Sequence, residues 1–180
     1  MGRTKFLLAS IVTAGAIVSG VLVAGASAPA SGTIHVLISQ LNRANGGGPV
    51  LVVGAIADAG TLSASFDKNG KVDPNGNYVN LLLSKGRIEI NFTALSAAGA
   101  AATPQLFKAT CSAYEATGAT TTIVKGTGSY VGITGSIKIT ETVALSFPRF
   151  TSGKNKGQCD STGAKTHVWG SLVGVGKEKI

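Results

Sequence analysis

The chain is poor in the side chains from which nucleic-acid and metal sites are usually built. Only 6% of its 180 residues are aromatic, and it has only two cysteines and two histidines. Because no segment alternates aromatic with basic residues, a platform for stacking single-stranded nucleic acid is excluded. A structural zinc site needs about four closely spaced ligands, which this sequence does not offer. We expect no nucleic acid partner, no metal and no cofactor.

Charged residues are also few, and their signs are unbalanced. Lys and Arg number 16 against eight Asp and Glu, giving a net charge of +8. Such an excess attracts nucleic acid or anionic envelope polymers where the basic residues cluster. Here they are dispersed, apart from Lys154 with Lys156 and the C-terminal Lys177 and Lys179, which flank Glu178. We interpret the charge as that of a solvated surface.

Residues 1–30 have the pattern of an export signal. Arg3 and Lys5 precede an apolar run over 6–26, and sites with small residues at the first and third positions follow. An uncleaved anchor is the alternative, because the run approaches the roughly 20 residues that span a bilayer. Its many glycines and alanines make it weakly hydrophobic for that task. We therefore predict a signal peptide and a secreted protein, extracellular or in the cell envelope, without a stable membrane span after cleavage.

Three overlapping cleavage sites end at Ala26, Ala28 and Ala30. Cleavage after Ala28 would leave Pro29 as the first residue, which processing peptidases tolerate badly, so Ala26 or Ala30 is favoured. The remaining residues, 31–180, have the length of one domain that buries a core of its own.

Long amphipathic helices are missing from this domain. Apolar residues alternate or come in short runs bounded by turn residues, which is typical of an all-β protein. The expected strands are 34–41, 50–57, 61–66, 78–83, 87–92, 105–115, 120–125, 136–145 and 166–175. A short helix is expected only in the alanine-rich segment 96–104. Antiparallel strands of this number, joined mostly by short turns, form a barrel or a sandwich.

The two cysteines, Cys111 and Cys159, most simply form one disulfide in an exported chain. The disulfide would close the loop between positions 111 and 159, and closing a loop of this size stabilises the fold by about 4 kcal/mol in the chain-entropy model. Catalytic thiol chemistry would need a free cysteine beside a base, so we do not expect it in a chain whose two cysteines are paired. The polar segment 148–163 is then tethered by the disulfide, either as a lid or partner site or as a solvated connection.

Four closely spaced glycines, Gly126, Gly128, Gly132 and Gly135, lead directly into an alternating strand. Glycine is used where the backbone needs a positive φ or where another chain approaches too closely for a Cβ atom. Tyr130 lies among them and can plug one end of a sheet.

This pattern, G-T-G-x-[FY]-x-G-x-x-G followed by alternating isoleucines, resembles the glycine-rich turn of the barrels grouped with allene oxide cyclase and the dirigent proteins. Over 51–158 the chain is also similar to exported actinobacterial proteins called allene-oxide-cyclase-barrel-like, whose function is generally unassigned. The resemblance implies a single antiparallel β-barrel of eight or nine strands rather than a sandwich. It also implies an apolar cavity, which in the plant cyclases folds a reactive fatty-acid epoxide with a glutamate and a bound water.

One strand indicates where chemistry would lie. Counting by twos from Ile137 places Glu141 in the same row as four aliphatic side chains, opposite a row of Lys, Thr and Ala. A carboxylate in such a row can serve as acid, base or anchor for a polar group of a ligand. The structural alternative is a bulge that reverses the row, or a glutamate at the rim that pairs with a basic side chain. The predicted ligand contacts are Glu141, Ile137, Ile139, Val143 and Tyr130.

No catalytic residue is assigned. Glu89 shares its row with Arg87 and Asn91 and is expected to face water, and no second acid is expected at an inward position. We therefore expect non-catalytic binding of a small apolar molecule or envelope component. The alternatives are a cyclase, isomerase or dirigent-like guide for a reactive lipid or terpenoid-like substrate, and a surface protein without a ligand.

The segment 50–57 is apolar on both faces, so both sides of that strand should be covered. Barrels of the resembling families assemble through their walls. We therefore expect a homo-oligomer with 50–57 at the interface.

Overall fold

The computed structural model describes residues 31–39, 48–162 and 167–180. The predicted signal peptide, its cleavage sites and the end of the strand expected at 34–41 lie outside the described residues. The elements are β1 (Ser31–Ser39), β2 (Pro49–Gly54), β3 (Asp58–Leu62), β4 (Tyr78–Leu83), β5 (Gly86–Asn91), α1 (Thr93–Ala101), β6 (Gln105–Phe107), β7 (Ser112–Gly128), β8 (Thr134–Ser146) and β9 (His167–Lys179).

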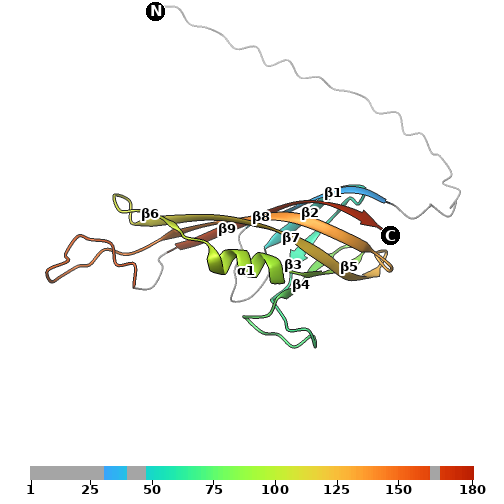
Figure 1. Cartoon of the computed structure of the whole chain (residues 1–180), viewed down its shortest axis with the longest axis horizontal. Helices are drawn as coiled ribbons and strands as arrows, with labels where there is room; N and C mark the ends of the chain where they lie inside the picture. The colour runs from blue at the N-terminus through green and yellow to red at the C-terminus, as the bar shows by residue number, and fades with distance from the viewer. Residues whose placement is uncertain (1–30, 40–47, 163–166) are drawn as a thin grey trace, which may run out of the picture.

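Eight of these strands close into an antiparallel barrel. The order runs β5-β4-β3-β2-β1-β9-β8-β7, and β5 pairs with β7 to complete the ring. The short β6 lies outside the ring and pairs only with the start of β7. The predicted all-β barrel of eight or nine strands is confirmed, and Figure 1 shows its strands curving around one another at the end where the C-terminus lies.

Three strands are much longer than the others. β7 has 17 residues and β8 and β9 have 13 each, whereas β2 to β5 have five or six. They therefore run on beyond the ring as an open sheet, against which α1 packs (Figure 1). We call this part the extension and define it as 112–118 of β7, 141–146 of β8 and 167–170 of β9. In the described structure its β7 segment pairs with no residue of β5, and its β9 segment pairs with no residue of β1. The rest of the ring is the closed end.

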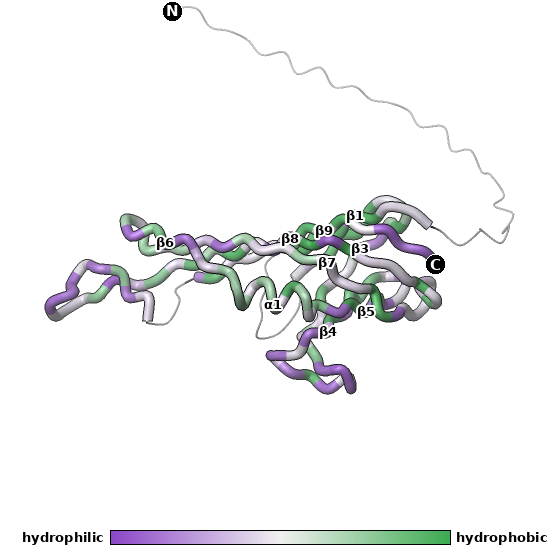
Figure 2. The backbone as a smooth tube through the Cα atoms, in the orientation of Figure 1, coloured by the Kyte–Doolittle hydropathy of each residue, from purple (hydrophilic) through white to green (hydrophobic). Residues whose placement is uncertain are grey.

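The closed end is filled by the inward rows of its strands. Ile34, Val52, Ile90 and Ile137 are each at most 1% exposed. Figure 2 shows the apolar residues gathered around the closed end, while the loop before β4 and the loop after β8 are mostly hydrophilic. The interior is therefore a packed core over this part of its length.

The outer wall of the closed end differs from the expectation for the segment 50–57. Leu51 and Val53 point outward from β2 and are 47% and 37% exposed. The expectation that both faces are covered is wrong for the single chain, because no helix or loop of the described residues packs on that wall.

The boundaries of two expected strands also change. The segment 105–115 divides at a turn ending at Cys111, which has a φ of 50°, and β7 then runs without a break to Gly128. The sequence showed no strand over 116–119 because its residues, Ala, Thr, Gly and Ala, are small or polar and do not alternate large aliphatic with polar side chains. The short helix expected at 96–104 forms slightly earlier, as α1.

The glycine pattern has the structural role that was predicted for it. Gly128, Gly132 and Gly135 have φ values of 62°, 88° and 142°. A Cβ atom on Gly126 would lie 2.1 Å from the carbonyl oxygen of Tyr130. The turn between β7 and β8 therefore requires glycine at all four positions.

Candidate ligand-binding pocket

A pocket of about 540 Å³ opens where the extension leaves the ring. The ring contributes Leu62 and Val79, α1 contributes Leu95 and Gly99, and the loop between β3 and β4 forms a further wall. The inner face of the extension supplies the remaining wall. The interior is thus packed at the closed end and hollow at the opposite end.

Two carboxylates line this pocket, Glu115 from β7 and Glu141 from β8. In the register of the two strands Glu115 is opposite Val143 and Glu141 is opposite Thr117, so the glutamates are diagonal neighbours on one face. Such positions are about 7–8 Å apart, within reach of long side chains. Both residues are partly buried.

The second inward acid corrects the sequence analysis, which expected none. The expected strand ended at Glu115, so its row could not be followed further. In the structure β7 is continuous, and Glu115 lies in the same inward row as Ala113, Thr121 and Ile123. Those three residues are buried. The shared parity of these positions was the signal that could have revealed it.

The predicted contact residues divide between the two ends. Glu141 and Val143 line the pocket. Ile137 and Ile139 lie in the same inward row but are fully buried in the core, and Tyr130 is buried at the closed end. Registers with β7 and β9 are regular through Thr140, so no bulge reverses the row. Sequence reasoning missed further apolar lining residues, among them Leu95, Phe92 and Leu172.

Tyr130 closes the end of the ring opposite the pocket. Its hydroxyl donates a hydrogen bond of 2.5 Å to Asp58, which also accepts from the hydroxyl of Ser84 and the backbone N–H groups of Ala59 and Lys85. Desolvation pushes the pKa of Asp58 upward, but these hydrogen bonds outweigh it and hold the pKa well below its usual range. Desolvation, together with the bond to Asp58 and its charge, raises the pKa of Tyr130. Tyr130 is thus a structural plug.

Glu89 does not face water as expected. It is 8% exposed, and its carboxylate lies 3.2 Å from the Nζ atom of Lys125 on β7. The register of β5 with β7 shifts between Glu89 and Ile90. Ile88 and Ile90 on either side of Glu89 are buried in the core, so Glu89 does lie in the outward row. The bulge in β7 places Lys125 opposite it, and this pairing on the outer face is what the sequence analysis missed.

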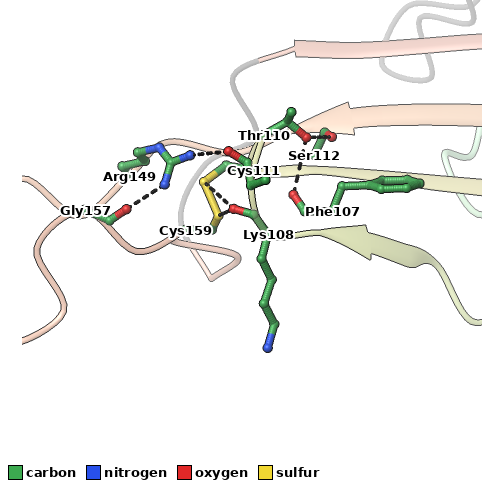
Figure 3. Close-up of a disulfide and its surroundings, with 9 residues drawn as sticks. Phe107, Lys108, Thr110, Cys111, Ser112, Arg149, Gly157 and Cys159 are labelled. Atoms are coloured by element: carbon green, nitrogen blue, oxygen red, sulfur yellow. Dashed lines mark hydrogen bonds between the residues drawn. A yellow bond between two sulfur atoms is a disulfide. The ribbon is translucent and has the colours of Figure 1, made fainter.

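The disulfide between Cys111 and Cys159 is present and joins positions 48 residues apart. It ties the turn before β7 to the loop 147–162, as Figure 3 shows. Arg149 reinforces the junction by donating to the carbonyl oxygens of Gly157 and Ala109. The loop 147–162 contributes no residue to the pocket, which favours the interpretation as a stapled connection over a lid.

Other kinds of site find little support in the described residues. No group of three or more His, Cys, Asp or Glu side chains there could hold a metal ion. The carboxylates of Asp67 and Asp73, which lie in glycine-containing turns, accept backbone N–H groups of Asn69 and Asn75. Among the same residues, no helix has the length and apolar character needed to cross a membrane.

No protein-family model, curated protein or solved structure matches the chain. A function for this barrel must therefore be argued from its own geometry.

Proposed function

We propose that the chain is exported and that its mature barrel binds a small, largely apolar molecule in the pocket without transforming it. The observation that carries the proposal is a pocket of about 540 Å³ with aliphatic and aromatic walls, a wall that carries Ser and Asn side chains, and two neighbouring carboxylates. Ligand sites are typically about 300–1,000 Å³, mostly apolar and marked by a few placed polar groups.

The two carboxylates restrict the ligand. An ionised carboxylate only accepts hydrogen bonds, so Glu115 and Glu141 favour a molecule with a hydroxyl, amide or cationic group at one end. The apolar remainder would lie against Phe92, Leu95 and Leu172. This chemistry fits an apolar metabolite or an envelope component with a donor head group.

Export is supported by the charged and apolar pattern of residues 1–30 and by the disulfide, since disulfides persist in oxidising compartments. Secretion and pocket binding are separable parts of the proposal. Fractionation of the producing cells tests the first without reference to any ligand.

The pocket is tested by native mass spectrometry of the protein from its host's culture medium, with a matched pair of variants. Gly99 lines the pocket, and a Cβ atom there meets nothing within 4 Å, so Gly99→Phe fills the space without a backbone clash. Ala97 is exposed on the same helix, and Ala97→Phe is the control. We expect a co-purifying mass in the wild type and the control that is lost in Gly99→Phe. Retention in Gly99→Phe, or its absence from all three, would contradict binding here.

A second candidate is a cyclase or isomerase, favoured by the two neighbouring carboxylates on one wall. One positioned carboxylate can move a proton while the other stabilises developing charge. Glu115→Gln and Glu141→Gln distinguish the candidates once the co-purified molecule is known. A binder loses affinity in both variants and leaves the molecule unchanged, whereas a catalyst loses turnover while still binding it.

The exposed wall of β9, β1 and β2 supports assembly with a second copy of the chain. Val173, Leu37 and Leu51 are direct neighbours across these strands, and Val175 and Val53 flank His35 in the next row. Across β9, β1 and β2 no Lys, Arg, Asp or Glu interrupts these two rows, and the row through Val175 reaches a basic residue only at Lys138 of β8. Light scattering of the mature protein should give a multiple of the chain mass, and Leu51→Lys should return the monomer.

A further inference from the structure

Glu178 is a buried carboxyl group at the end of the barrel opposite the pocket. It is 4% exposed, and both of its carboxylate oxygens are buried without a hydrogen-bond partner. It points inward between Gly32 of β1 and Gly135 of β8, neither of which has a side chain to offer. Because a buried carboxylate without a partner is strongly unfavourable, this position favours a positive charge beside it.

The described neighbours do not supply that charge. Lys177 and Lys179 alternate with Glu178 along β9 and point to the outer face, where both are exposed. The residues of β1 and β8 beside Glu178 are Ser, Thr and Gly, and Ala55 of the next turn is apolar.

The residue that begins β1 at this end of the ring is Ser31, which is opposite Lys179 in the register with β9. Ser31 precedes Gly32, which is directly opposite Glu178. Ser31, Gly32, Thr33, Lys177 and Glu178 line one depression in the surface, and Lys177 makes no hydrogen bond to the Glu178 carboxylate there. The start of β1 lies at the same end of the molecule as the C-terminus (Figure 1). Cleavage after Ala30 would turn the backbone nitrogen of Ser31 into a terminal amine.

We propose that the chain is processed between Ala30 and Ser31 and that the new terminal ammonium of Ser31 pairs with the carboxylate of Glu178. In this step water adds across the Ala30–Ser31 peptide bond under a signal peptidase, leaving a carboxylate on Ala30 and an amine on Ser31. The amine is protonated at neutral pH because α-amino groups have a pKa of about 8. The proposal rests on the export part of the proposed function, and it makes processing the step that completes the closed end.

Among the cleavage sites that the sequence left open, a start at Ser31 places the terminal amine on the residue next to Gly32, which is directly opposite Glu178. We therefore take Ala30 as the last residue of the signal peptide.

The pairing predicts a pH dependence with a definite sign. Desolvation raises the pKa of Glu178. Without a partner, its contribution to stability is present below the ordinary pKa of about 4.3 and is lost as the pH rises through the folded value. The ammonium lowers the pKa of Glu178 in the folded state, so less stability is lost when Glu178 ionises. The full loss of stability returns above a pH of about 8, where the amine deprotonates.

The test compares chains of residues 31–180, which contain every strand of the ring and both cysteines. Four proteins are needed, with a free or an acetylated Ser31 amine, each with Glu178 or Glu178→Gln. At pH 7 the free amine should raise Tm by about 3 °C with Glu178 and should change little with glutamine. Equal Tm values with Glu178 would overturn the pairing. An equal shift in both backgrounds would also overturn it, because the effect of the ammonium would then not depend on Glu178.

Two further measurements keep the result decisive if Glu178→Gln does not fold. The free and acetylated chains with Glu178 should diverge between pH 5 and 7 and converge above pH 9, and parallel curves would contradict the proposal. Sequencing of the exported protein should begin at Ser31, and a start at Ser27 or Pro29 would reject the processing site. No ligand enters these measurements, so they stand or fall separately from binding in the pocket.

Discussion

The closed end and the extension share the strand β8 yet make different use of the same inward row. Ile137 and Ile139 are fully buried where the ring is complete. Glu141, Val143 and Leu145 continue the row and are only partly buried where the sheet has left the ring. Closure therefore decides whether an inward residue belongs to the core or to a pocket, and the change falls at the glutamate.

The two ends are also secured differently. The closed end depends on a glycine turn and on Tyr130 bound to Asp58, both of which are local non-covalent arrangements. The far edge of the extension depends on the disulfide and on Arg149. An open sheet has fewer neighbours to hold its end, so a covalent link is the appropriate device there.

Removal of the disulfide should have the largest effect. Cys111→Ser combined with Cys159→Ser should lower the free energy of unfolding by about 4 kcal/mol in the chain-entropy model, measured by urea denaturation. Amide hydrogen exchange should show that protection falls more in 112–118 and 141–146 than in 134–139. Equal loss of protection at both ends would mean that the extension and the ring unfold as one unit.

Truncation within the inward row of β8 should have the next effect. Ile139→Ala leaves a cavity in the packed core and should cost about 3 kcal/mol. Val143→Ala removes part of a pocket wall that is already partly exposed and should cost about 1 kcal/mol or less. Similar losses for the two variants in thermal denaturation would show that the extension is packed as tightly as the ring.

The sequence predicted the closed end better than the extension, for a physical reason. Strict alternation of aliphatic residues at 136–139, and the glycines before it, reflect a tightly packed ring in which each position has one acceptable kind of side chain. The pocket face combines Glu115 and Glu141 with aliphatic residues, and small or polar residues occupy 116–119, so alternation fades and β7 was divided into two strands. Pairing partners such as Lys125 for Glu89 depend on register, which a bulge had shifted.

A smaller effect is expected from glycines with positive φ in the two regions. Gly132 in the closed-end turn and Gly153 in the loop after β8 have φ values of 88° and 76°, and a Cβ atom on either would meet nothing within 4 Å. Alanine at either position is strained by about 1 kcal/mol. If the loop is only loosely coupled to the barrel, Gly153→Ala should lower Tm less than Gly132→Ala does. The reverse order would show that the stapled loop is the better coupled segment.

The smallest effect, and one that depends on pH, is expected from Tyr130→Phe, which removes one donor to Asp58. Because the pKa of Asp58 is lowered in the fold, its contribution to stability is present above the ordinary pKa of about 4 and is lost as the pH falls. The raised pKa of Tyr130 adds a contribution that is lost as the pH rises above about 10. The variant should therefore unfold at a lower temperature than the wild type between these limits, with the difference shrinking toward pH 2. Tyr114→Phe, at an exposed tyrosine of the extension, is the control. It should show no such pH dependence, because the hydrogen bond to Asp58 comes from Tyr130 at the closed end.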